Sequence, residues 1–154
     1  MRVLVAGGGT GGHLYPGIAV AQEIKARRPD AEVVFVGTAY GLESRVIPRE
    51  GFPLEVIRSA GLKGKSLPGI LYGLFLLPLS ALDAWRVLSG RSPEVVIGVG
   101  GYSSGPVLLL ASFRGIPTLL LEQNAMPGFT NRLLAWVIDV AAVAYRESTK
   151  FFRG

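Results

Sequence analysis

A run of glycines behind a short apolar segment is the feature that most constrains how this chain folds. Five of the six residues from 7 to 12 are glycine, and they follow the segment RVLVA at 2–6. Glycine tolerates positive φ and lets another group approach the backbone closely. A helix that follows such a turn presents unpaired N–H groups and a partial positive charge. Because a bare turn needs only one or two glycines, the run predicts a strand–turn–helix unit whose turn binds a phosphate or a sugar.

Apolar segments alternate with segments of helical periodicity along the whole chain. The strands are nearly continuous runs of Val, Ile and Leu, as expected for parallel strands that are buried on both faces. This alternation predicts an α/β fold in one domain, a Rossmann-like, doubly wound and mostly parallel sheet. Strands are expected at 2–6, 32–37, 54–59, 94–100, 117–123 and 139–145, and helices at 18–28, 42–50, 68–88 (kinked or broken at Pro78), 105–113 and 128–137.

Composition limits the chemistry and the partners of the chain. The formal net charge is +5 and the sequence pI is about 9.9, which favours anionic partners such as phosphate, nucleic acid or acidic lipid. Without cysteine the chain has no disulfides and no thiolate zinc sites, and one histidine with dispersed acids does not make a metal site. The mean hydropathy of +0.41 predicts that one face contacts lipid or another domain.

Two nucleotide-binding motifs compete for the glycine run. Gly7, Gly9 and Gly12 satisfy the G-x-G-x-x-G dinucleotide pattern. That pattern also needs an acid at the end of the second strand to bind the ribose, and the segment 37–39 there is Gly-Thr-Ala. An NAD(P) function is therefore weakened, although it stays open. The P-loop is excluded because no Gly-Lys-Ser/Thr follows.

A second glycine turn, GVGGYSSGP at 98–106, also lies between a predicted strand and a predicted helix. Gly100 and Gly101 free its backbone, while Ser103 and Ser104 offer hydroxyls that can cap the helix. Tyr102 offers a phenol or a stacking face. The simpler alternatives are a plain N-cap for Ser104 and a core aromatic for Tyr102.

A third turn, EQNAMPG at 122–128, follows the next predicted strand. Glu122, Gln123 and Asn124 place polar side chains where that strand ends. Ligands of open α/β sheets bind at the carboxyl ends of the strands. Three such turns at one edge predict a binding site there.

His13, the single histidine, directly follows the glycine run. An imidazole accepts a proton at neutral pH, and general-base help is worth roughly 10²–10⁴ in rate. His13 could therefore deprotonate a sugar hydroxyl that attacks an anomeric carbon. A binding role, through a hydrogen bond to a backbone carbonyl or a phosphate, is given equal weight. Glu122 is the rival base.

The segment from Ser66 to Leu82 carries no charged residue over 17 positions. It is shorter than the roughly 20 residues of a spanning helix, and it contains two prolines and two glycines. Basic residues flank it, which suits the surface of an anionic membrane. We expect one stripe of this helix to pack on the sheet and the other to contact lipid. The predicted membrane-contacting residues are Leu67, Ile70, Leu71, Leu74, Phe75, Lys63, Lys65 and Arg86.

Three blocks of the sequence, in this order, resemble the MurG family of bacterial peripheral membrane glycosyltransferases. They are GGTGGHLYPGIAVA at 8–21, GVGGYSSGP at 98–106 and EQNAMPGFTNRLLA at 122–135, and the likeness covers essentially the whole chain. The resemblance implies one half of a GT-B glycosyltransferase fold. Residues 1–154 would be the N-terminal acceptor-binding domain, and the C-terminal UDP-GlcNAc-binding domain would be absent from this chain. The isolated chain would then be inactive.

The implied reaction moves N-acetylglucosamine (GlcNAc) from UDP-GlcNAc to the C4 hydroxyl of N-acetylmuramic acid (MurNAc) in lipid I. It gives lipid II with inversion, at the cytoplasmic face of the bacterial plasma membrane, as a step of peptidoglycan synthesis on which cell shape and division depend. The implied partners are lipid I, an anionic membrane surface and the missing domain, without nucleic acid. No tightly bound cofactor is implied, and the metal dependence stays open.

The resemblance also implies roles for single residues. The donor would contact Thr10, Gly11, Gly12 and Asn124, and the acceptor pyrophosphate would contact Gly9, Gly100, Gly101, Tyr102, Ser103 and Ser104. His13 would be the candidate base, with Glu122 as rival or support. Two other functions stay open: a non-catalytic subunit that binds lipid or anions and anchors a catalytic partner, and an NAD(P)-binding Rossmann domain.

Overall fold

A computed structural model describes residues 1–61 and 67–152 of the chain. The strands within these ranges form one six-stranded sheet of order β3-β2-β1-β4-β5-β6, and every neighbouring pair is parallel. This confirms the doubly wound parallel fold. In chain order the elements are β1 (Arg2–Gly7), α1 (Gly11–Arg27), β2 (Glu32–Gly37), α2 (Glu43–Arg49), β3 (Leu54–Val56), α3 (Leu67–Arg91), β4 (Val95–Gly100), α4 (Ser104–Phe113), β5 (Thr118–Glu122), α5 (Phe129–Leu134), β6 (Val140–Val143) and a final 3₁₀ turn, η1 (Arg146–Phe151).

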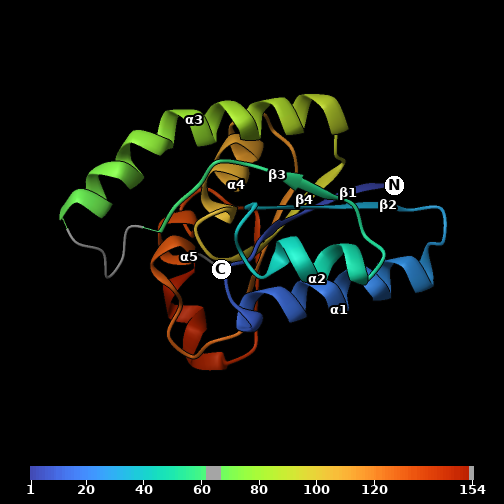
Figure 1. Cartoon of the computed structure of the whole chain (residues 1–154). Coiled ribbons are helices and arrows are strands. Elements are labelled where there is room, and N and C mark those ends of the chain that lie inside the picture. The colour runs from blue at the N-terminus through green and yellow to red at the C-terminus, as the bar shows by residue number, and fades with distance from the viewer. Residues whose placement is uncertain (62–66, 153–154) are drawn as a thin grey trace.

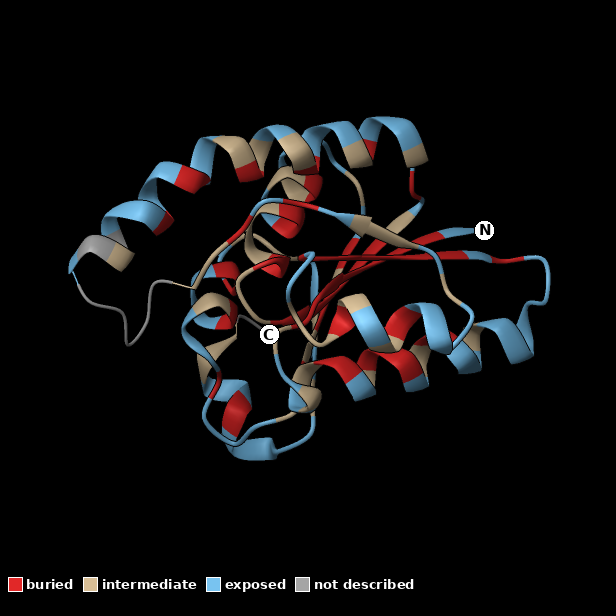
Figure 2. Ribbon diagram, viewed as in Figure 1, coloured by how far each residue is buried: buried red, intermediate tan, exposed pale blue. Residues whose placement is uncertain are grey.

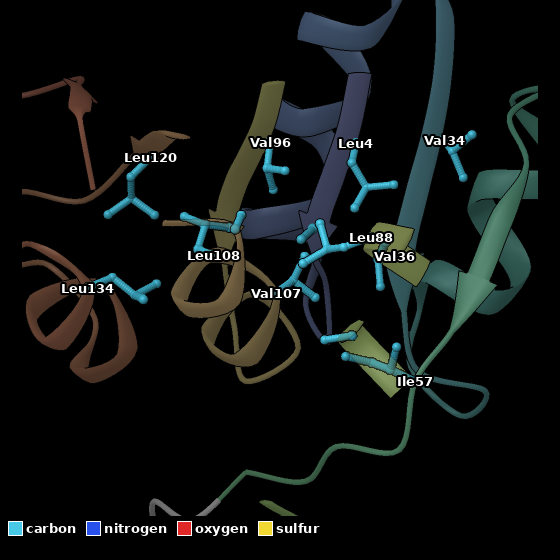
Figure 3. Close-up of a cluster of buried hydrophobic side chains, with 13 residues drawn as sticks. Leu4, Val34, Val36, Ile57, Leu88, Val96, Val107, Leu108, Leu120 and Leu134 are labelled. Atoms are coloured by element: carbon cyan, nitrogen blue, oxygen red, sulfur yellow. The ribbon is translucent and has the colours of Figure 1, made fainter. Parts of the chain in front are cut away.

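Helices cover both faces of the sheet (Figure 1). Successive residues of a strand point to opposite faces, so Val3 and Val5 enter one core while Leu4 and Ala6 enter the other. The first core lies under α1 and α2, and the second lies under α3, α4 and α5. Figure 3 shows the second core, and Figure 2 shows the central strands buried along their length. Burial on both faces explains why the strands are continuously apolar.

The two edge strands are shorter than predicted. β3 has three residues, paired with Phe35 to Gly37 of β2, and β6 has four, paired only with β5. Each has a strand neighbour on one side alone, so fewer hydrogen bonds hold its ends.

α1 begins at Gly11, seven residues before the predicted start at 18. Local helix propensity disfavours this start, because Gly11 and Gly12 are poor helix formers and Pro16 lacks an N–H. Leu14 is fully buried in the core beneath α1. Burial of such a side chain stabilises by about 1.5–3 kcal/mol, which offsets a large part of the cost of these residues. The early start places His13 in the first turn of the helix.

α3 is one continuous helix that passes through Pro78, so of the kink or break predicted there, the break does not occur. A buried stripe holds it against the protein from Gly73 onward, and its members recur every three or four residues: Gly73, Leu76, Ser80, Ala84 and Leu88. The backbone N–H and Nε of Arg58 donate to Oδ2 of Asp83 at 3.0 and 2.7 Å, and Nη2 donates to Oδ1 at 2.7 Å. These hydrogen bonds and the Arg58 charge lower the pKa of Asp83. The second half of α3 is therefore fixed to the segment that follows β3.

The buried stripe of α3 yields a stability prediction. Leu88→Ala should lower the free energy of unfolding by about 2–5 kcal/mol, because the Leu88 side chain is fully buried and its removal leaves a cavity. Leu82→Ala is the matched control on the outer face of the same helix, where Leu82 is 44% exposed, and it should change stability by less than about 0.5 kcal/mol. Urea denaturation of the two variants measures the difference. Equal losses of unfolding free energy in the two variants would contradict the assignment of Leu88 to the buried stripe and Leu82 to the outer face.

Candidate functional site

The strand order reverses between β1 and β4. The three turns predicted from the sequence follow β1, its neighbour β4, and β5 on the far side of β4. Crevices at such a reversal bind ligands in open α/β sheets. Hydrogen bonds join the turns directly. The N–H of Gly8 donates to the carbonyl of Gly100 at 3.3 Å, and Nε2 of Gln123 donates to the carbonyl of Val99 at 2.9 Å. The structure therefore brings the three turns together.

The first turn ends where α1 begins. The carbonyl of Thr10 accepts hydrogen bonds from the N–H groups of His13 at 3.2 Å and Leu14 at 3.1 Å. The N–H groups of Gly11 and Gly12 precede these residues and donate to no acceptor in the described part of the chain. Together with the helix dipole they can bind an anion.

The sequence analysis missed Glu43, which stands at the start of α2 beneath this turn. Glu43 is 1% exposed. Its Oε2 accepts the Gly9 N–H at 2.7 Å, and its Oε1 accepts the Thr38 N–H at 2.9 Å and the Thr38 hydroxyl at 2.8 Å. The dinucleotide-binding pattern needs an acid at 37–39 to bind a ribose. Glu43 comes later in the sequence, and its carboxylate is fully engaged by protein donors.

The second turn holds the imidazole of His13. Gly100 has φ +97°, and a Cβ there would lie 2.6 Å from Nδ1 of His13, so the ring rests on a bare stretch of backbone. Nδ1 is buried and has no hydrogen-bond partner in the described chain. Within the described residues, neither ring nitrogen of His13 makes a hydrogen bond to a backbone carbonyl, so Nε2 is left as the nitrogen that can serve a ligand.

The start of α4 presents backbone amides rather than hydroxyls. Ser103 and Ser104 are both buried, and the Ser104 hydroxyl donates to the carbonyl of Gly101 at 2.8 Å. α4 begins at Ser104, with Ser103 as its N-cap and without a side-chain cap. Within the described ranges, the N–H groups of Tyr102 and Ser103 donate to no protein acceptor. They are available to an anion next to His13.

Tyr102 is half-buried between the two glycine turns. A Cβ at Gly9 would lie 3.3 Å from its hydroxyl, and a Cβ at Gly61 would lie 3.0 Å from Cδ1 of its ring. Burial, and next the charge of Glu43, raise the pKa of Tyr102. The phenol therefore keeps its proton at neutral pH and can donate a hydrogen bond.

The third turn is organised by Glu122, which is 2% exposed. Oε1 accepts the backbone N–H of Asn124 at 2.8 Å and its side-chain amide at 3.0 Å. Oε2 accepts the Gly128 N–H at 3.3 Å and the Asn131 amide at 2.8 Å. Four donors thus occupy this carboxylate, which orients Asn124 at the edge of the sheet.

A hollow of about 380 Å³ lies at the same edge, between α1 and the last two strands. It is lined by Pro16, Val20, Leu121, Glu122, Gln123, Ala142, Val143 and Ala144. His13 and the second turn do not line it. Among the described residues, no group of three or more His, Asp and Glu side chains is arranged to hold a metal ion.

Comparison with known proteins identifies the family. Residues 3–143 match the family described as "Glycosyltransferase family 28 N-terminal domain". This chain belongs to glycosyltransferase family 28. A relative of this family 28 domain from Myxococcus xanthus (strain DK1622) is named UDP-N-acetylglucosamine–N-acetylmuramyl-(pentapeptide) pyrophosphoryl-undecaprenol N-acetylglucosamine transferase. It is 54% identical over 152 residues, which are 99% of this chain and 40% of the relative.

Another relative and a solved structure support the same family. A protein of the same name from Ruminiclostridium cellulolyticum is 48% identical over 153 residues, 99% of this chain and 42% of that protein. The crystal structure of Acinetobacter baumannii MurG matches with a TM-score of 0.83 and 33% identity, over 95% of this chain and 42% of that one. The family 28 domain thus spans about two fifths of the length of the proteins that it matches.

A more distant neighbour shares the fold alone. The UDP-GlcNAc 2-epimerase from Neisseria meningitidis, solved with UDP-GlcNAc bound, matches with a TM-score of 0.70 but 16% identity, over 98% of this chain and 42% of that one. The Rossmann-like fold and the GT-B relationship predicted from the sequence are confirmed by the MurG match.

The contact between His13 and Gly100 gives a test of the site geometry. In Gly100→Ala the new Cβ should displace the imidazole, and a side chain at positive φ adds about 1–2 kcal/mol of backbone strain. Gly115→Ala is the matched control: φ there is +66°, but open space surrounds the site of its Cβ. The imidazole C–H resonances of His13 in NMR spectra should move only in Gly100→Ala. Unchanged resonances in that variant would refute the contact.

Proposed function

We propose that this family 28 domain is the acceptor-binding half of an inverting GT-B transferase that moves GlcNAc from UDP-GlcNAc to lipid I. The observation that carries the proposal is the placement of His13 between two sets of unpaired backbone amides. One set comes from Gly11 and Gly12, and the other from Tyr102 and Ser103. The names of relatives that are about half identical over 99% of this chain supply the donor and the acceptor.

The two sets of amides suit two ligands. Thr10, Gly11, Gly12 and Asn124 would contact the donor at one end of the edge. Gly100, Gly101, Tyr102, Ser103 and Ser104 would surround the acceptor pyrophosphate, mostly through backbone amides because both serine hydroxyls are buried. Gly9 is not included among the residues that bind the pyrophosphate, because its N–H already donates to Glu43. Most of the nucleotide pocket would come from the part of the relatives that lies outside the matched region.

His13 is the better candidate base of the two that the sequence offered. Its Nε2 makes no hydrogen bond to the described part of the chain, whereas the Glu122 carboxylate is buried and accepts four hydrogen bonds. With its proton on Nδ1, the neutral imidazole can accept at Nε2. The MurNAc C4 oxygen then gives its proton to Nε2 and bonds to C1 of GlcNAc, while UDP leaves with the bonding electron pair. Attack opposite to UDP inverts the anomeric centre. Glu122 supports the reaction by orienting Asn124.

The two alternatives gain no support from the similar proteins. The dinucleotide alternative also conflicts with Glu43, because the carboxylate nearest the end of β2 is bonded to Thr38 and Gly9 rather than open to a ribose.

A chimera tests the transfer reaction. Residues 1–154 are joined to the C-terminal part of the Myxococcus xanthus transferase, and transfer of radiolabelled GlcNAc to a lipid I analogue is measured. His13→Ala should lower kcat by about 10²–10⁴-fold, the usual worth of a general base. Gln22→Ala, an exposed change in the same helix, is the control and should leave kcat unaltered.

Two outcomes would count against the proposal. A His13→Ala chimera that transfers at the unmodified rate would remove His13 as base. An unmodified chimera that folds but does not transfer, beside an active intact Myxococcus protein, would refute the proposed function of this domain.

We also propose that α3 holds the domain on the cytoplasmic face of the bacterial plasma membrane, as a peripheral protein. Leu67, Leu71 and Phe75 are 71%, 60% and 69% exposed, and Leu74 is 47% exposed. Together they form one apolar stripe on the solvent side of the helix, opposite its buried stripe. Figure 2 shows this surface exposed. Arg86 lies further along α3, exposed beside Asp83. Lys63, Lys65 and the side chain of Ile70 fall outside what the structure describes.

Length and composition alone would let α3 cross a membrane. An 18-residue window within its segment Leu71–Arg91 has a mean hydropathy of 1.3, and 33% of that window is buried within the domain. The contacts with α4 and the Arg58–Asp83 pair favour a helix that lies on the surface. α3 begins at the carboxyl edge of the sheet, because it returns from the end of β3 to the start of β4 (Figure 1). Its apolar end therefore lies on the same side as the proposed acceptor site.

Vesicle flotation tests this orientation. The chain should float with phosphatidylglycerol vesicles at low salt, and Phe75→Glu should reduce binding by about 10-fold or more, since each fully buried apolar side chain contributes about 1.5–3 kcal/mol. Phe113→Glu is the control, because Phe113 is 73% exposed on α4, outside the stripe. Absence of flotation for the unmodified chain, or equal losses in both variants, would contradict the proposal.

A further inference from the structure

We propose that Glu43 is a positioning residue that fills the first glycine turn in place of a ligand phosphate and thereby sets the position of His13. The part of this inference that concerns catalysis rests on the proposed function. The part that concerns the turn stands on geometry alone.

The carboxylate of Glu43 makes the kind of contacts that a bound anion would make. It accepts two backbone N–H groups, from Gly9 and Thr38, and one hydroxyl, from Thr38. None of the ion pairs in the described chain involves it. A buried carboxylate without a cation depends on such donors for its stability. The turn and the carboxylate therefore require each other.

The glycines around this carboxylate are needed for it to fit. A Cβ at Gly8 would lie 2.5 Å from Cδ of Glu43, and a Cβ at Gly37 or Gly41 would overlap the same side chain. Gly8 belongs to the glycine run, Gly37 is the last residue of β2, and Gly41 follows β2. Part of the glycine content of the first turn thus serves an internal group rather than a ligand.

The charge of Glu43 directs an incoming anion away from Gly9. A phosphate at that amide would lose its donor to Glu43 and would meet a like charge nearby. The unpaired amides of Gly11 and Gly12, and of Tyr102 and Ser103, are the places that remain. This explains how a chain with the G-x-G-x-x-G pattern can bind an anion at other backbone amides than a dinucleotide-binding domain does.

Glu43 is connected to His13 by two hydrogen bonds and the peptide bond between Gly9 and Thr10. Gly9 is bonded to Thr10, and the Thr10 carbonyl accepts the N–H groups of His13 and Leu14. A shift of Gly9 would therefore move the start of α1, together with the imidazole and the amides of Gly11 and Gly12. Small misplacements of reacting groups cost about 10²-fold in rate.

Two variants of Glu43 and one control separate this role from loss of charge. Glu43→Gln keeps the size but replaces one oxygen with an NH₂ group, which then faces an N–H donor of either Gly9 or Thr38. Glu43→Asp keeps the charge but is one methylene shorter, so it cannot reach both sides of the turn. Glu50→Gln removes the same charge just beyond α2, where Glu50 is exposed and accepts only the Gln22 amide at 3.1 Å.

The first measurement does not depend on activity. In NMR spectra of the 154-residue chain, the amide protons of Gly9 and Thr38 should lie downfield, since they are bonded to a carboxylate. Both should move upfield in Glu43→Gln and stay in place in Glu50→Gln. Unchanged amide shifts in Glu43→Gln would overturn the proposal. If Glu43→Gln does not fold, Thr38→Val decides, because it removes one donor to Glu43 and should still shift the Gly9 amide.

The second measurement uses the chimera. Glu43→Gln should lower kcat by about 10²-fold, with little change in the KM for the acceptor, because the reacting groups are displaced while acceptor binding by the α4 amides is retained. Glu43→Asp should recover part of the rate, and Glu50→Gln should match the unmodified chimera. A Glu43→Gln chimera with full kcat would overturn the positioning role. An inactive unmodified chimera would instead refute the proposed function, and the amide shifts would still decide the role of Glu43 in the turn.

Discussion

The close approach of two backbone turns at the reversal of strand order is the constraint on which the rest of the site depends. Gly8 donates to the carbonyl of Gly100, and a Cβ at Gly101 would lie 2.5 Å from the carbonyl oxygen of Gly8. Side chains at these positions would separate the two turns. Because they are absent, the starts of α1 and α4 lie next to each other, and both present unpaired N–H groups at one edge of the sheet.

Two buried carboxylates stabilise this edge from within the protein. Glu43 organises the turn after β1, and Glu122 organises the turn after β5. Each accepts backbone N–H groups, and neither is open to solvent. The exposed chemistry is left to His13, to the phenol of Tyr102 and to the amides. This division is typical of sites in which inner groups hold the contacting groups in place.

The arrangement of α3 connects the site with the membrane proposal. Its second half is fixed by the Arg58–Asp83 pair and by buried packing, while its first half presents an apolar stripe to solvent. Gly61, the last residue described before the helix, packs against the ring of Tyr102. The charge of Tyr72 in α3 is also among the causes that raise the pKa of Tyr40, after burial and Tyr102. The apolar end of α3 and the glycine turns therefore belong to one region, as the proposed lipid-linked acceptor would require.

The sequence by itself determined the layered fold and the three turns, and it singled out His13 as the candidate base. Continuous Val and Ile runs require burial on both faces, and glycine runs between strand and helix require a bare backbone, so both features are local and visible in one dimension. The tertiary structure alone decided the early start of α1, which buries Leu14 despite two glycines and a proline in the same helix. It also decided the roles of the carboxylates. Glu43 is 34 residues from Gly9, and only the folded sheet brings them within 2.7 Å, so no local pattern could have assigned that contact.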